Sequence, residues 1–356
     1  MLDTDANPAV NATSPTTNST ATFLTSMKMQ ILSGRGFQIR TGPAQALYEA
    51  VLRWIQCGML GGMVYGQSRL GKTSAIRWVC KHLSDMFGFI RFIEVPIRTQ
   101  KFYSETGFFE YLMQCCGLKE ASSGQRATQR RNTLHQYILA QAERSPLRMV
   151  IIVFDEAQDI AHLNLKWIQN IANELETHGV RLFVLLVGQP ELSELKTQSI
   201  SVGAEHFVGR YMVCSHPFEG IRSEPQLAEV FAAYDATIFP PKGKRNPGAL
   251  RVKDHFLSPD LAQRIDLQQL ASSFWPAFEN IWKLQKPSVQ MEIPMHYVTS
   301  SLMFCLEDMS KLPADVTEIP TTLIKNSADL SGFRESVEMS AMRFARDAPK
   351  HAGGRR

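Results

Sequence analysis

Residues 66–73 constrain this chain more than any other segment, because they read Gly-Gln-Ser-Arg-Leu-Gly-Lys-Thr. They fit the pattern of a glycine, four variable residues, Gly-Lys and a serine or threonine. A short apolar run at 63–65 precedes them, and an amphipathic stretch at 72–86 follows. Glycines let a loop wrap closely around phosphates, and the N–H groups of a helix N-terminus favour negative charge. An incidental glycine turn is the alternative, and it leaves the flanking strand and helix unexplained. We therefore expect a phosphate-binding loop.

A pair of carboxylates, Asp155 and Glu156, follows the apolar run 149–154 and begins the string Asp-Glu-Ala-Gln. Carboxylates at the end of a buried strand lie where open α/β sheets bind ligands. With the loop, they predict a nucleoside triphosphate site in which Lys72 contacts the β- and γ-phosphates, Thr73 and Asp155 bind Mg²⁺, and Glu156 activates water. Alone, such a pair is more typical of a helix cap or a solvated turn. The predicted nucleotide-contacting residues are Gly66, Gln67, Ser68, Arg69, Leu70, Gly71, Lys72, Thr73, Ser74 and Asp155.

Gln189 and Arg210 are the remaining catalytic candidates. Gln189 follows the apolar run 181–187, where we expect it to contact the γ-phosphate or the attacking water. An ordinary turn residue is the alternative. Arg210 precedes a last short strand, expected at 211–216. An arginine in that place can stabilise transition-state charge in the nucleotide site of a neighbouring subunit. An ion pair within its own chain is the alternative.

Apolar runs and amphipathic stretches alternate through the middle of the chain. A further strand is expected at 89–95, and helices are expected at 107–116, 128–143 and 166–177. Strands that are apolar throughout and alternate with helices imply an α/β fold with a parallel sheet covered on both faces. A helix within 37–57 is expected to start after Thr41-Gly42-Pro43. Helices at 224–234, 259–274 and 295–306, interrupted by a basic, proline-broken loop at 239–248, imply a small helical lid.

The expected domain organisation has four parts. They are a disordered leader at 1–22, a nucleotide-binding domain at 23–220, a helical lid with C-terminal helices at 221–340, and a basic, flexible tail at 341–356. The leader is rich in threonine, asparagine and serine, too polar to repay the entropy of ordering. The tail is either a docking segment for a partner protein or a solubilising end.

Composition excludes several classes of protein. The 356 residues are 44% hydrophobic and 20% charged, as in globular proteins rather than fibrous or disordered ones. A formal net charge of +4 requires any DNA-binding surface to be a local patch. No apolar stretch approaches the ~20 residues that cross a bilayer, and the N-terminus does not resemble a secretory signal. The six cysteines include no Cys-x-x-Cys pair, which argues against a zinc ribbon or a disulfide framework. We expect a cytoplasmic protein.

The ordered motifs together resemble the AAA+ superfamily of ATPases. The phosphate loop, Asp-Glu-Ala-Gln, Gly-Gln-Pro-Glu-Leu and Gly-Arg-Tyr strings are most similar to the TnsC/TniB transposition regulators, whose relatives include the ExeA-type ATPases of secretion. The likeness spans roughly residues 37–221. It implies an AAA+ P-loop fold, ATP and Mg²⁺ as ligands, and assembly into filaments or rings on double-stranded DNA that connect a target-selecting protein with a transposase. In the lid, no Gly-x-x-Arg occurs at a convincing sensor-2 position, and the string Gly332-Phe333-Arg334 comes late.

Two basic clusters are candidates for duplex binding, because lysine and arginine can follow phosphates without reading sequence. A solvated surface is the alternative for each cluster. Two other functions remain open: an ExeA-type secretion or assembly ATPase, and a replication-initiator-like DNA loader, which predicts an appended helix-turn-helix or winged domain. A nucleotide-binding scaffold without turnover is disfavoured by Glu156. The candidate DNA-binding residues are Lys101, Tyr103, Arg126, Arg130 and Arg131.

Overall fold

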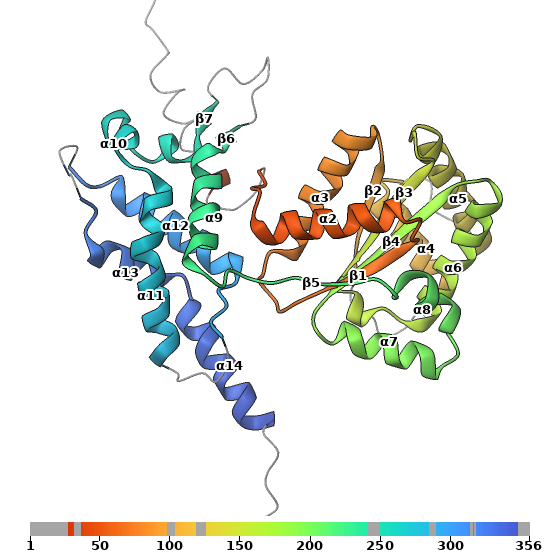
Figure 1. Ribbon diagram of the computed structural model, residues 1–356. Coiled ribbons are helices and arrows are strands. Elements are labelled where there is room, and N and C mark those ends of the chain that lie inside the picture. The colour runs from red at the N-terminus through yellow and green to blue at the C-terminus, as the bar shows by residue number, and fades with distance from the viewer. Residues whose placement is uncertain are drawn as a thin grey trace, which may run out of the picture.

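The computed structural model describes residues 28–31, 37–97, 104–118, 126–240, 249–284, 290–313, 316 and 318–347, the last seven by their backbone alone. These residues form two bodies that lie side by side (Figure 1). One is an α/β body in which helices flank a central sheet, and the other is helical. The linker that follows β5 runs from one body to the other.

Five strands form the sheet of the α/β body, in the order β2-β3-β4-β1-β5, and all of its pairings are parallel. The strands are β1 (Gly61–Tyr65), β2 (Arg91–Pro96), β3 (Met149–Asp155), β4 (Arg181–Gly188) and β5 (Ser215–Pro217). In the register, Tyr65 lies opposite Gly188 and Pro96 lies opposite Asp155. The carboxyl ends of these strands therefore meet at one edge of the sheet. The predicted α/β class with a parallel sheet is confirmed.

Helices cover both faces of this sheet. Ile152 and Phe154 of β3 share a core with the helices on one face. Ile151 and Val153 of the same strand belong to the core on the other face. The first face carries α4 (Glu105–Cys115), α5 (Ala127–Glu143), α6 (His162–Thr177), α7 (Leu192–Ser201) and α8 (Glu205–Tyr211), and the second carries α2 (Gly42–Gln56) and α3 (Lys72–Phe87). Burial on both faces explains why the strands are apolar throughout.

The start of α2 follows the predicted signal. The Thr41 side chain accepts a hydrogen bond from the Ala44 N–H (3.2 Å), and a proline occupies the first turn. Such a cap satisfies one of the N–H groups that a helix start leaves unpaired. Before Thr41, Phe37 and Ile39 pack against the core of the helical body, and both line a cavity together with the phosphate loop.

The helical body begins at Ile221 and has a core of its own, which confirms the predicted helical lid. Ile31 is also buried in that core, although it precedes the α/β body in sequence. The short strands β6 and β7 pair antiparallel. The elements are α9 (Glu224–Ala236), β6 (Ile238–Phe239), β7 (Leu250–Arg251), η3 (Val252–His255), α10 (Pro259–Arg264), η4 (Leu267–Leu270), α11 (Ala271–Leu284), α12 (Met295–Met309), α13 (Thr321–Leu330) and α14 (Phe333–Asp347).

The last strand of the sheet is shorter than predicted. The expected strand at 211–216 is replaced by β5, and Tyr211 belongs to α8. Phe207, Val208 and Tyr211 are all buried, at the spacing of one helix face. Helical packing of these side chains therefore outweighs the strand tendency of the short apolar run.

Two helical segments also differ from expectation. The helix expected at 259–274 is interrupted at Asp266, whose carboxylate accepts from the Gln268 N–H (2.9 Å) and starts a new turn. At the C-terminus, α14 extends to Asp347, so residues 341–347 are helical rather than part of a flexible tail. Within the described ranges, no helix is both long and apolar enough to span a membrane.

Candidate nucleotide site

The loop of residues 66–73 joins β1 to the first turn of α3, as predicted. Its fixed glycines have physical reasons. A Cβ atom at Gly66 would collide with the Phe218 carbonyl, and Gly71 has a φ of 96°, in the left-handed region that favours glycine. The Gly66 N–H donates to the Gly188 carbonyl at the end of β4 (3.2 Å). The loop is therefore anchored to the sheet where it leaves β1.

Lys72 lies buried inside the loop. Its ammonium group donates to the carbonyl oxygens of Gly66 (2.7 Å) and Gln67 (2.8 Å). Burial lowers the pKa of Lys72, and the charges of Glu156 and Asp155 act against that shift. A lysine beside two strand-end carboxylates matches the predicted pairing of the two motifs. Charge-assisted contacts to phosphate oxygens can replace its bonds to neutral carbonyls, because ionised partners make stronger hydrogen bonds.

Thr73 and Asp155 are in direct contact. The Thr73 hydroxyl donates to Asp155 Oδ2 (2.7 Å), and Asp155 Oδ1 accepts from the Glu156 N–H (3.1 Å). Ser74 lines the cavity beside them. Hydroxyl and carboxylate oxygens are ligands that Mg²⁺ prefers, together with phosphates. In the part of the chain that the structure describes, no cluster of three or more His, Cys, Asp or Glu side chains could hold a metal. The pair therefore fits an ion shared with a phosphate ligand.

Glu156 is exposed just beyond β3 and has φ 55° and ψ 41°. That left-handed conformation costs a non-glycine residue about 1 kcal/mol, and such strain is concentrated at functional sites. Gln189 Nε2 lies 3.4 Å from Glu156 Oε2. Gln158, which the sequence analysis did not single out, is closer and donates to the same oxygen (2.7 Å). The structure thus brings the predicted base and the predicted sensor together, with an additional amide.

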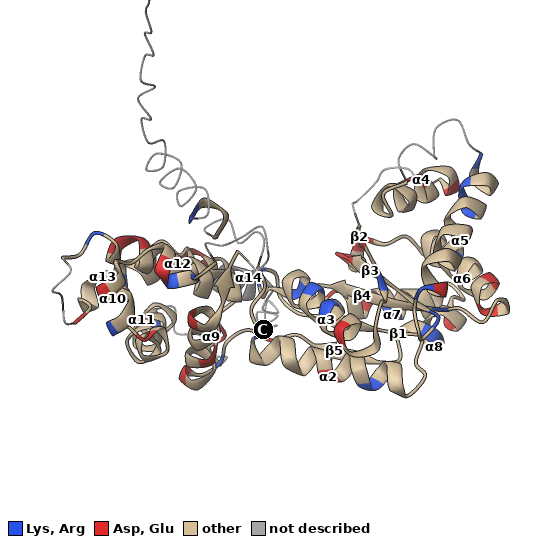
Figure 2. Cartoon of the chain, turned by 90° about the horizontal axis from the view of Figure 1, so that it is seen from above, with Lys and Arg blue, Asp and Glu red and all other residues tan. Residues whose placement is uncertain are grey.

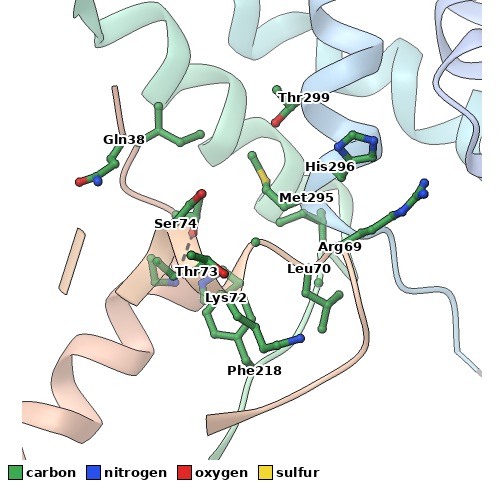
Figure 3. Close-up of a pocket in the computed structure, with 18 of the residues that line it drawn as sticks. Gln38, Arg69, Leu70, Lys72, Thr73, Ser74, Phe218, Met295, His296 and Thr299 are labelled. Atoms are coloured by element: carbon green, nitrogen blue, oxygen red, sulfur yellow. Dashed lines mark hydrogen bonds between the residues drawn. The ribbon is translucent and has the colours of Figure 1, made fainter. Parts of the chain in front are cut away.

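A cavity of about 400 Å³ opens beside the loop, and both bodies line it. Phe37 and Ile39 come from the segment before α2, and Tyr234 and Thr299 come from the helical body. Figure 3 shows Met295 and His296, at the start of α12, above the loop that carries Leu70 and Lys72. A volume of this size falls within the range of about 300–1,000 Å³ that is usual for ligand pockets. The sequence offered no motif for the lining residues that come from the helical body.

Arg69 connects the loop to the helical body. Its carbonyl accepts from the His296 N–H (3.1 Å), and its guanidinium donates to the Tyr297 hydroxyl (3.1 Å). Burial and the positive charge of Arg69 lower the pKa of His296. Arg334, from the late Gly-Phe-Arg string, pairs instead with Asp329 (2.5 Å) and is not among the residues that line the cavity. The lid therefore reaches the loop through the start of α12.

Arg210 stands in the last turn of α8 and contacts α6. Its guanidinium donates to Asn173 Oδ1 (2.6 Å) and lies 3.3 Å from Glu176 Oε2. It lines a second cavity together with Arg181, which begins β4. Because β4 ends at the phosphate loop, Arg210 lies near the opposite edge of the sheet from its own nucleotide cavity. Any role at a nucleotide would have to be in a neighbouring subunit.

The basic candidates for DNA binding do not form a continuous surface in the described residues. Lys101 and Tyr103 lie outside those residues. Arg126 is exposed at the start of α5, and Arg131 pairs with Glu174 on α6 (2.9 Å). Lysine and arginine occur on both bodies, among aspartate and glutamate, with a group along α3 (Figure 2). Of the candidate cations in the described residues, Arg126 is the exposed one.

Arg130 is a correction to the sequence-based expectation. Only 7% of the residue is exposed. Its guanidinium donates to Glu110 Oε2 (2.7 Å) and to the Thr106 carbonyl (3.0 Å), both on α4. A buried arginine paired in this way holds α5 against α4 and presents no donor surface to a duplex. Its position on the inner face of α5, one turn from Arg126, explains the difference.

The strand order, the loop between β1 and α3, the carboxylates at the end of β3 and the helical lid define an AAA+ P-loop fold. A family described as an AAA domain matches residues 58–195, from just before β1 into α7. No curated protein sequence matches the chain.

Solved structures resemble the chain in fold. The Aeropyrum pernix ORC2 protein in its ADPNP–ADP complexes aligns with a TM-score of 0.55 and 13% identity, over 85% of this chain and 71% of that one. The ADP form of the same protein aligns with a TM-score of 0.52 and 15% identity, over 83% and 69%. These similarities extend the AAA+ fold from the α/β body into the helical one.

Proposed function

We propose that this protein is an ATPase that uses its nucleotide state to control assembly on double-stranded DNA. The cavity beside Lys72, which both bodies line, is the observation that carries the proposal. ATP in that cavity contacts the loop on one side and the start of α12 on the other. Binding and hydrolysis then change how firmly the two bodies are held together, which is the usual basis of a nucleotide switch.

Each residue of the site has a role in this proposal. The loop N–H groups and Lys72 bind the β- and γ-phosphates. Thr73 and Asp155 would hold Mg²⁺, which neutralises phosphate charge when bound. Glu156 accepts a proton from the attacking water, and Gln189 orients the water or the γ-phosphate. The 2.7 Å contact between Thr73 and Asp155 supports this assignment, because it brings the two motifs to one point.

The resemblance to TnsC/TniB regulators supports the finer part of the proposal. In that account, copies of the chain form filaments or rings on target DNA and connect a target-selecting protein with a transposase. Cations such as Arg126 and Lys101 would contact the phosphates of the duplex, and Tyr103 would contact its sugar edge. Binding dominated by phosphates is independent of sequence and weakens steeply with salt. Arg130 takes no part in it because it is buried.

In an assembly of several copies, Arg210 can act at a nucleotide, which it cannot reach within its own chain. In the proposed oligomer it reaches the nucleotide of the neighbouring subunit and stabilises transition-state charge. Arg210→Ala should lower the rate of ATP hydrolysis, whereas Glu176→Gln, which removes its charged partner and keeps the guanidinium, should not. If both variants lose stability equally and hydrolysis is unchanged, the role of Arg210 is to hold α8 against α6.

The likeness in fold to ORC2 over 85% of the chain favours a second candidate, a replication-initiator-like DNA loader. Electron microscopy of the purified protein with duplex DNA, with and without ATP, tests what both candidates share. Filaments or rings that need both ligands support assembly on DNA. Particles that never associate with duplex exclude both candidates and leave an ATPase of another kind. Recruitment of a transposase to the assemblies then separates the regulator from the loader.

A further inference from the structure

Gln158 lies within the candidate site but has no role in the function described so far. It belongs to η2 (Ala157–Asp159), the short turn that follows Glu156, and its side chain is half-buried. Its amide nitrogen donates to Glu156 Oε2 (2.7 Å), and its amide oxygen accepts from the Gln189 backbone N–H (3.0 Å). One side chain therefore joins the end of β3 to the end of β4.

Two neighbouring residues, Gly188 and Glu156, lie close to this amide. A Cβ atom at Gly188 would lie 2.4 Å from Gln158 Oε1, so the Gln158 amide can keep this position only beside a residue without a side chain. Glu156 keeps its left-handed backbone conformation at φ 55° while Gln158 and Gln189 both approach Oε2. The contact to Gln158 is the shorter of the two, at 2.7 Å against 3.4 Å. The carboxylate is thus oriented chiefly by Gln158.

We propose that Gln158 is a positioning residue that aims the Glu156 carboxylate and links it to the turn that carries Gln189. This inference rests on the proposed ATP hydrolysis at the site. A displacement of the Gln189 turn is passed to Glu156 through one amide, so the base and the sensor move together. Only a side chain with both a donor and an acceptor can make this bridge, which explains an amide rather than a carboxylate at position 158.

The charges around Glu156 decide what a change at this position does. Lys72 on α3 interacts electrostatically with Glu156, with Asp155 at the end of β3 and with Glu191 in the turn before α7. Gln158→Glu adds a further negative charge in contact with Glu156 and keeps an acceptor for the Gln189 N–H. Gln158→Met has similar length and supplies neither the donor nor the acceptor.

These two variants test the proposal, with Gln198→Glu, an exposed glutamine on α7, as the matched control for added charge. Both changes at Gln158 should lower kcat for ATP about tenfold with KM changed less than about twofold, because orientation rather than binding is lost. Gln198→Glu should leave both unchanged.

A second measurement does not depend on hydrolysis. Hydrogen exchange of the Gln189 amide should quicken in Gln158→Met and stay slow in Gln158→Glu, since only the second retains the acceptor. An unchanged exchange rate of the Gln189 amide in Gln158→Met overturns the proposal, as does an unchanged kcat in Gln158→Met. Absence of ATP hydrolysis by the unmodified chain would instead overturn the proposed function. In that case, the exchange result still shows whether Gln158 links the two strand ends.

Discussion

The contact between Arg69 and Tyr297 joins the phosphate loop to the lid, and Tyr297→Phe removes it with the smallest possible change. The substitution deletes the hydroxyl that accepts from the Arg69 guanidinium (3.1 Å) and keeps the buried ring. The guanidinium also lies 5.7 Å from the centre of that ring, a contact that phenylalanine preserves in part. The variant therefore tests the hydrogen bond alone.

The expected loss is about 1 kcal/mol. A hydrogen bond to a charged group is worth about 1.5–3 kcal/mol. Arg69 is exposed, so its guanidinium can turn to water, and the value falls to that of an ordinary hydrogen bond, about 0.5–1.5 kcal/mol. A loss of about 1 kcal/mol makes local separation of loop and lid about fivefold more frequent.

Hydrogen exchange of the His296 amide reports this separation, because that N–H donates to the Arg69 carbonyl. We expect exchange about fivefold faster in Tyr297→Phe. The matched control is Tyr234→Phe, which removes a hydroxyl bonded to Thr299 (2.9 Å) inside the helical body. If the two variants change His296 exchange equally, or Tyr297→Phe changes nothing, the contact does not hold the loop to the lid.

Three further predictions concern other parts of the chain. Gly66→Ala should abolish nucleotide binding, because the added Cβ atom collides with the Phe218 carbonyl. Gly209→Ala, which lies in open space within α8, should instead raise the free energy of unfolding in urea by about 0.5–1 kcal/mol. Burial raises the pKa of Tyr234 to about 12, above an unfolded value of about 10. Its contribution to the free energy of unfolding is therefore complete below about pH 10 and declines as the pH rises towards 12. Tyr234→Phe should lose less of its free energy of unfolding than the unmodified chain over this pH range. Arg130→Met should lower the free energy of unfolding by about 2 kcal/mol and leave duplex affinity unchanged, because Arg130 is paired with Glu110 on α4. Weaker duplex binding with unchanged stability would instead show that Arg130 contacts DNA.

The phosphate loop and its carboxylates could be predicted because each motif is contiguous and is flanked by the elements that position it. The strand ends that carry Gly66, Asp155 and Gln189 lie at one edge as a result of parallel pairing alone. Once the sheet is predicted, the meeting of Thr73 with Asp155 follows, although 82 positions separate them. Gln158 was visible in the same string, but only the structure shows that its amide turns back to Glu156.

Other features depend on packing between distant segments and had no local signal. Met295 and His296 reach the cavity because the helical body folds back over the loop, and their sequence indicates only the start of a helix. Arg126 and Arg130 look alike in sequence, yet one turn of α5 separates an exposed arginine from one buried against α4. The amphipathic pattern runs on through Asp266, but the Asp266 side chain caps a new turn and so interrupts the helix there.

We expect Lys72 and Glu156 to belong to one ATP-hydrolysing site, and Glu156→Gln separates binding from hydrolysis there. Binding of a fluorescent ATP analogue and release of phosphate are measured on the unmodified chain, Glu156→Gln and Lys72→Ala, with the exposed Lys81→Ala on the same helix as the control. We predict that Glu156→Gln binds ATP with parental affinity while hydrolysis falls at least about 100-fold, and that Lys72→Ala loses binding. Hydrolysis at the parental rate in Glu156→Gln would contradict the account.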